Sequence, residues 1–147
     1  MPIIAHRRRP DVHDDPDVAL VSLDELFQRS DVLSLHAPLT PDTTEVINKQ
    51  SLSLMKPSSI LINTGRGGLI NEGDLADSLK SGQIAFAAVD VLMQEPPLYE
   101  CPLIGIDNCI ITPHQAWASK QSRMRLIDGV VLNIQEHMAG SPRNVVN

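Results

Sequence analysis

What this 147-residue sequence lacks argues against several classes of protein. Its two cysteines, Cys101 and Cys109, do not have the spacing of a metal or redox motif, so we expect no metal site and two free thiols suited to a reducing cytoplasm. No apolar run is long enough to span a bilayer, and no basic-then-apolar leader opens the chain. The sequence therefore predicts a cytoplasmic protein without a membrane partner.

Positive charge is also scarce. The chain has 12 Lys and Arg against 18 Asp and Glu, which gives a net charge of −6 and argues against a general nucleic-acid binder. The local exception is the basic run HRRR at residues 6–9. The hydrophobic and charged fractions, 42% and 20%, are those of an ordinary globular protein, and the length suits one domain.

Strand and helix patterns alternate along the chain. Ser22 followed by Glu25 is a capping box, Asn71 can cap a helix that ends near Gly82, and an apolar stripe with helical spacing marks the last segment. We expect strands at 2–5, 31–36, 60–63, 85–92 and 108–114, and helices at 22–30, 51–57, 71–82 and about 118–140. This alternation predicts an α/β fold with a parallel sheet and helices on both faces.

The exits of these strands carry the candidate chemistry, because ligands of open α/β sheets bind outside the carboxyl ends of the strands. Arg66 could pair with a carboxylate through its planar fork, and His114 could protonate a carbonyl oxygen. Glu95 could favour the imidazolium form of the histidine. Together they suit a small 2-keto acid, although a solvated Arg66, an exposed Glu95 and a structural His114 are the plain alternatives.

Two separated stretches carry a resemblance. LINTGRGGLINEGDLADSLKSGQIAFAAVDVLMQEPP, followed by NCIITPHQAWAS, resembles the C-terminal half of the D-isomer-specific 2-hydroxyacid dehydrogenases, and TPHQAWAS with the ending NVVN is most similar to their glycerate dehydrogenase (hydroxypyruvate reductase) branch. The resemblance covers residues 1–147. It implies that Arg66 binds the substrate, that His114 is the acid–base residue and that Glu95 pairs with it.

The resemblance also implies a nicotinamide cofactor. Asp90 would lie beside the carboxamide, and residues around the strand exits would line the pocket, so the implied cofactor-binding set is Arg7, Arg8, Pro38, Thr64, Gly65, Arg66, Asp90 and His114. Because arginines can accept a 2′-phosphate, the basic run Arg7–Arg9 favours NADP over NAD. A solvated basic strand end is the alternative. His36 is expected to be structural, and Trp117 is expected either to shape the substrate pocket or to anchor the last helix.

The sequence departs from this resemblance at its front. It contains no G-x-G-x-x-G motif, so we expect an incomplete doubly wound, Rossmann-like sheet that is missing its first strand and glycine-rich loop. Residues 1–147 would be a partial NAD(P)-binding domain, a fragment whose last helix packs toward an absent substrate domain. We expect strand 2–5 to be displaced, or a partner chain to fill the gap before strand 31–36. The family resemblance suggests a homodimer; a truncated, non-catalytic binding module like the family's corepressors is the alternative function.

Overall fold

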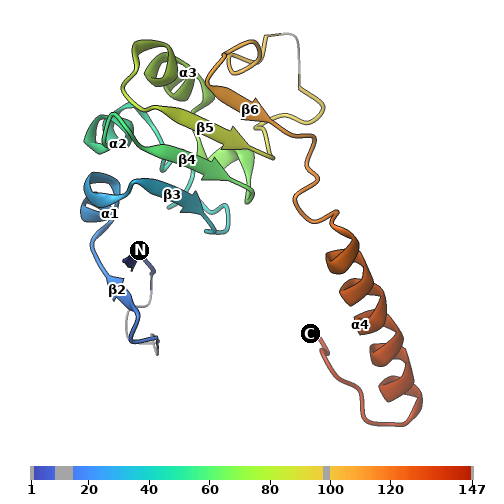
Figure 1. Ribbon diagram of the computed structural model, residues 1–147. Helices are drawn as coiled ribbons and strands as arrows, with labels where there is room; N and C mark the ends of the chain where they lie inside the picture. Colours follow the sequence, from blue (N-terminus) through green and yellow to red (C-terminus); the bar gives the residue numbers. More distant parts are fainter. Residues whose placement is uncertain (1, 9–14, 98–99, 147) are drawn as a thin grey trace. The chain divides into compact units, whose positions relative to one another are not determined.

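The computed structural model describes residues 2–8, 15–97 and 100–146 (Figure 1). It divides into two compact units, Met1–Pro113 and His114–Asn147, which are described separately below. The first unit contains β1 (Ile3–Ala5), β2 (Val18–Leu20), α1 (Leu23–Arg29), β3 (Val32–Leu35), α2 (Lys49–Leu54), β4 (Ile60–Asn63), the 3₁₀ helix η2 (Gly67–Leu69), α3 (Glu72–Ser81), β5 (Phe86–Val89) and β6 (Cys109–Ile111). The second contains α4 (Lys120–Met138).

The strands of the first unit form two parallel sheets. Four strands lie in the order β3-β4-β5-β6, and all of their pairings are parallel (Figure 1). The prediction of a Rossmann-like parallel α/β fold is therefore confirmed. β1 pairs with β2 and not with β3, in agreement with the expected break between these strands. The short strand β2 was not predicted, because three residues after a proline-broken loop carry no readable alternation.

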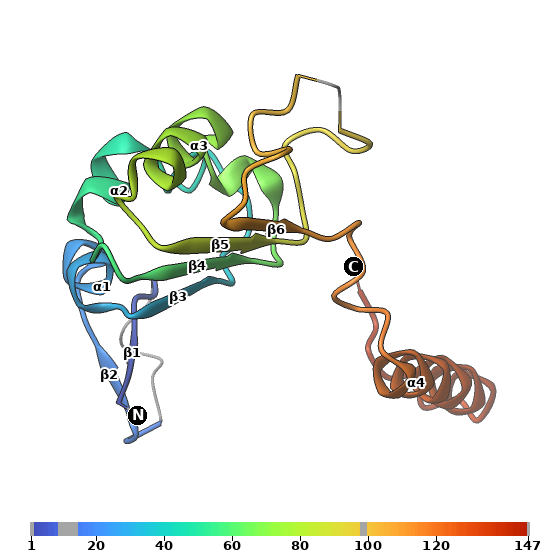
Figure 2. The same ribbon diagram turned by 45° about the horizontal axis from the view of Figure 1, so that its top comes forward.

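Side chains of the four-stranded sheet alternate between a covered and a bare face. α1, α2 and α3 lie on the same side of this sheet (Figure 2), and they cover Leu33, Leu61 and Ala87. The opposite face carries Val32 and Ile110, each about half exposed at 50% and 53%. Helices on both faces were expected, but the described helices of this unit cover one face only.

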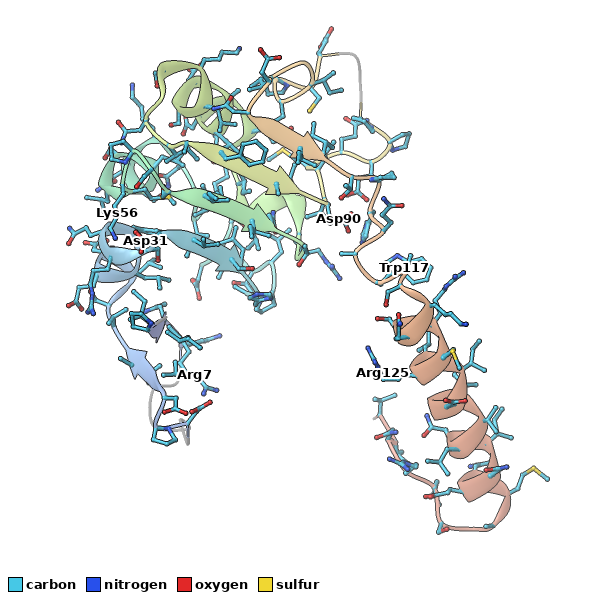
Figure 3. The ribbon with its side chains drawn as sticks, viewed as in Figure 1. Arg7, Asp31, Lys56, Asp90, Trp117 and Arg125 are labelled. Atoms are coloured by element: carbon cyan, nitrogen blue, oxygen red, sulfur yellow. The ribbon has the colours of Figure 1, made fainter. Side chains whose placement is uncertain are left out.

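Helix ends in the first unit follow the caps predicted from the sequence. The Ser22 side chain accepts the Glu25 amide while Glu25 accepts the Ser22 amide, which is the predicted capping box. Asn71 caps α3, and Gly82 ends it in the left-handed conformation at φ 73°. At the start of β3, Lys56 bonds Asp31 at 2.7 Å and also donates to the Arg29 carbonyl (Figure 3).

The second unit is dominated by α4, close to the predicted helix at 118–140. Ser119 caps it by accepting the Ser122 amide. Its apolar residues, Met124, Ile127, Val130, Val131, Ile134 and Met138 among them, are exposed in this structure. None of the helices in the described residues is both long and apolar enough to cross a membrane.

Candidate active site

The carboxyl ends of β4, β5 and β6 are tied together by hydrogen bonds just beyond the strands. The Asp90 amide donates to the Asn63 carbonyl at 2.8 Å, and the Thr112 amide donates to the Val89 carbonyl at 3.0 Å. The Thr112 hydroxyl donates to the Asp90 carboxylate at 2.5 Å. Asp90 is only 5% exposed, and Figure 3 shows it at the end of β5. The predicted site residues that follow β4 and β5 therefore leave the sheet at one edge.

Asn63 shapes the turn that presents Arg66. Its side chain is fully buried at the end of β4, where Oδ1 accepts the Gly65 amide at 3.0 Å and Nδ2 donates to the Arg66 carbonyl at 2.9 Å. A buried amide whose donor and acceptor are both used holds a turn firmly. Asn63 is not among the site residues predicted from the sequence, although asparagine at a strand end is a frequent turn former.

Arg66 itself is exposed and lies in extended backbone, with φ −142°. Its Nη1 donates to the Gly65 carbonyl at 2.8 Å. The guanidinium thus lies at the sheet edge and not in the core, which makes it accessible to an anionic ligand. Thr64 is also exposed, and Gly65 is half-buried.

Gly67 is the position in this turn that most requires glycine. A Cβ there would lie 2.0 Å from the carbonyl carbon and oxygen of Leu92. At Gly65 the nearest atoms to such a Cβ are 3.5 Å away, which is ordinary contact, and neither glycine has a positive φ. Gly67 is therefore needed for the close approach of two backbone segments and not for a sharp turn, whereas neither reason applies to Gly65.

That second segment carries Glu95. The Leu92 amide donates to Glu95 Oε1 at 2.9 Å, and the Met93 amide donates to Glu72 Oε1 at 2.7 Å. We call residues 91–95 the β5 turn and residues 63–67 the Arg66 turn. Since Leu92 also packs on Gly67, the β5 turn and the Arg66 turn are fixed against each other, and Arg66 and Glu95 leave neighbouring parts of the same edge.

The exit of β3 completes this edge. Pro38 is exposed, and its carbonyl accepts the Thr43 hydroxyl at 2.7 Å. Leu39 lies against Gly68, since a Cβ at Gly68 would be 2.9 Å from Leu39 Cδ2. His36, expected to be structural, bonds the Ser34 hydroxyl at 2.9 Å.

His114 opens the second unit and is exposed. Its φ of 49° lies in the left-handed region, which is uncommon for a residue with a side chain and often marks a functional position. The Trp117 indole N–H donates to the His114 carbonyl at 2.9 Å (Figure 3). Trp117 therefore anchors the backbone of the predicted acid–base residue.

The basic residues after β1 are placed at a different strand exit. Arg7 and Arg8 are exposed, and Arg7 is seen beyond β1 in Figure 3. His6, just before them, bonds the Val21 carbonyl through Nδ1 at 3.1 Å. Arg9 lies outside the described residues.

The predicted catalytic and cofactor-binding residues lie within the part of the chain that a protein-family model matches. The family model described as "D-isomer specific 2-hydroxyacid dehydrogenase, NAD binding domain" matches residues 1–116. The chain belongs to this family. The resemblance expected from the two sequence stretches is confirmed.

Two relatives of this dehydrogenase domain support the predicted branch. It is 51% identical to a hydroxypyruvate reductase from Blautia hydrogenotrophica over 86% of this chain and 39% of that protein. It is 48% identical to a glycerate dehydrogenase from Methylorubrum extorquens over 89% of this chain and 42% of that protein. The chain thus spans about two fifths of the length of these relatives.

A solved structure of an acyclic imino acid reductase in complex with NADPH and D-Arg is similar over the whole chain. Its TM-score is 0.86 and its sequence identity 35%, and the match covers 100% of this chain and 46% of that one. The parallel α/β arrangement of this dehydrogenase domain is therefore one that solved reductases share.

Proposed function

We propose that this chain supplies the NAD(P)-binding part, and with it the residues Arg66, Glu95 and His114, of an oxidoreductase that reduces small 2-keto acids to D-2-hydroxy acids. Hydroxypyruvate and glyoxylate are the favoured substrates. The observation that carries the proposal is the pair of interlocked turns that brings Arg66 and Glu95 out at one sheet edge. Relatives named hydroxypyruvate reductase and glycerate dehydrogenase support it.

The residues at this edge fit the nicotinamide end of the cofactor. The buried carboxylate of Asp90 is an acceptor suited to a carboxamide N–H₂, and its orientation is held by Thr112. Pro38 follows β3, and Thr64 and Gly65 follow β4. The backbone of these residues would line the nicotinamide pocket. When bound, the reduced nicotinamide would supply a hydride to the keto carbon.

The protein residues would then divide the remaining work. Arg66 would bind the carboxylate of the keto acid and polarise its carbonyl, an interaction that strengthens as negative charge grows on oxygen. His114 would donate the proton that the developing alkoxide needs, and Glu95 would favour the imidazolium form.

Mutation in an enzyme that contains the whole chain tests these roles. In a chimaera, these 147 residues replace the matching segment of the Blautia hydrogenotrophica hydroxypyruvate reductase. We expect hydroxypyruvate-dependent oxidation of NAD(P)H, a loss of turnover of about a hundredfold or more in His114→Ala, and a raised KM with lowered kcat in Arg66→Lys. Lysine keeps the charge but lacks the planar fork.

His36→Ala and Arg125→Lys are the matched controls. His36 is a second histidine at a strand exit, and Arg125 is an exposed arginine on α4. Both variants should keep turnover within about twofold. A folded chimaera without activity on hydroxypyruvate or glyoxylate would favour a non-catalytic binding module instead.

We also propose that the cofactor is NADP. The support is the exposed pair Arg7 and Arg8 directly after β1, where a guanidinium can bind a 2′-phosphate. In the chimaera, Arg7→Ala with Arg8→Ala should lower kcat/KM for NADPH by about tenfold and change that for NADH by less than about twofold. Equal losses with both cofactors would contradict the assignment.

A further inference from the structure

Two successive backbone amides of the β5 turn donate hydrogen bonds to two different carboxylates. The Leu92 amide donates to Glu95, within the turn, and the Met93 amide donates to Glu72, the first residue of α3. The first contact orients the carboxylate that we assign to the acid–base pair. The second has no part in the roles assigned so far.

Glu72 is itself held in place. α3 begins at Glu72 with Asn71 as its cap, and acidic residues are favourable in the first turn of a helix. Its Oε1 accepts the Met93 amide at 2.7 Å, while its Oε2 accepts the Cys101 thiol at 3.7 Å. Both oxygens therefore have a partner, and the carboxylate joins the helix to the loop that follows β5.

The β5 turn is fixed from a second direction by the Arg66 turn. Gly67 packs its backbone directly on the carbonyl of Leu92. With Glu72 on the next amide, the segment that carries Glu95 is held both from the residue beside Arg66 and from α3. Loss of either contact would free the Leu92 amide to move relative to Glu95.

We propose that Glu72 is a positioning residue for Glu95. By holding the Met93 amide, it fixes the turn in which the Leu92 amide aims the Glu95 carboxylate. The inference rests on the proposed function for its catalytic meaning, because Glu72 acts through Glu95 and not on the substrate. A plain stabilising acid at a helix start is the competing explanation.

Aspartate at this position separates the two explanations. Glu72→Asp keeps the negative charge at the start of α3 but is too short by one methylene to reach Met93, whereas Glu72→Gln keeps the reach and one acceptor oxygen. Asp74→Asn is the matched control, because Asp74 lies in the same helical turn, is also partly exposed, and accepts a different amide, that of Lys49, at 2.7 Å.

Amide hydrogen exchange of the 147-residue chain gives the first readout. Glu72→Asp should speed exchange of both the Met93 and Leu92 amides by about tenfold, the loss expected for a hydrogen bond to a charged group. Glu72→Gln should stay within about threefold of the unmodified chain. Asp74→Asn also keeps one acceptor oxygen, so it should leave exchange of the Met93 and Leu92 amides unchanged. Unchanged Leu92 exchange in Glu72→Asp would overturn the proposal.

Kinetics of the chimaeric reductase give the second readout. Glu72→Asp should lower kcat by about tenfold with KM for hydroxypyruvate within about twofold, because Arg66 remains in place, and Glu72→Gln should restore most of the rate. An active chimaera in which Glu72→Asp has normal kcat would refute the positioning role. A chimaera inactive without any mutation would instead contradict the proposed function, and the Leu92 exchange would still decide whether Glu72 holds the turn.

Discussion

At the scale of single residues, the site depends on small groups that let two backbone segments meet. Both polar atoms of the Asn63 side-chain amide form hydrogen bonds inside the Arg66 turn. Gly67 leaves room for the Leu92 carbonyl. The arginine is thus presented by two buried neighbours. Mutations at these neighbours should be costly even though they carry no charge.

Gly67→Ala tests this packing. A methyl group 2.0 Å from backbone atoms cannot be accommodated by a rotamer change, so we expect a loss of about 1–3 kcal/mol in the free energy of unfolding. The measurement is urea denaturation of the chain.

Gly68→Ala is the control for that experiment. Its added methyl would meet the flexible Leu39 side chain at 2.9 Å, which can turn away, so its cost should be less than about 1 kcal/mol. Equal costs for the two variants would show that the approach of Leu92 to Gly67 is not what requires glycine.

At the scale of elements, β6 places a cysteine thiol in a partly buried position. Cys109 begins this strand and is half-buried. Burial, with a smaller contribution from nearby Cys101, raises the pKa of the Cys109 thiol from 9.0 to about 11. Because the unfolded chain loses this proton first, the raised pKa lowers the stability of the folded state as pH rises from 9.0 toward about 11, and has no effect at lower pH.

Alkylation of Cys109 should show the same shift. A Cys101→Ser variant leaves Cys109 as the only thiol and keeps burial, the larger cause of its raised pKa. At pH 9, iodoacetamide should therefore react far more slowly with the folded protein than with the denatured chain. The rate on the folded protein should keep rising with pH above 9.0, where the reaction of the denatured chain begins to level off. Similar rates in folded and denatured protein would contradict the shift.

At the scale of the whole molecule, these residues supply only the nicotinamide end of the proposed cofactor site. The nicotinamide end has its candidate residues around Asp90 and Thr64, but the sequence holds no G-x-G-x-x-G turn for the pyrophosphate. That turn and the helix start after it normally bind the phosphates. The chain by itself should therefore recognise the cofactor poorly.

Calorimetry with the 147-residue chain tests that expectation. We expect no binding of NADH or NADPH tighter than about 100 μM, since the phosphate contacts contribute a large share of affinity for dinucleotides. The chimaera is the control and should bind at least about tenfold more tightly. Micromolar binding by the isolated chain would mean that its own residues hold the phosphates.

Much of the fold could be predicted from the sequence, because many of its helices and strands are specified by local sequence patterns. The capping box at Ser22, the Gly82 helix end and the apolar run at 60–63 each depend on neighbours in sequence, and each predicted element is present. β2 was missed because its three residues become a strand only by pairing with β1. Helices on the second face of the sheet were expected because strand and helix patterns alternate along the sequence. That alternation does not specify on which face of the sheet each connecting helix lies.

The sequence by itself determined the parallel α/β architecture, the family and the residue types at each strand exit, since these depend on periodicity and motif order. Only the tertiary structure decided how the exits are joined: the Asn63 bonds inside the Arg66 turn, the close approach of Gly67 to Leu92, and the contact of Glu72 with Met93. The last two contacts link residues far apart in the chain, so their geometry depends on how α3 and β5 pack in three dimensions. The Asn63 bonds are local in sequence, but they form where folding buries that side chain at the end of β4.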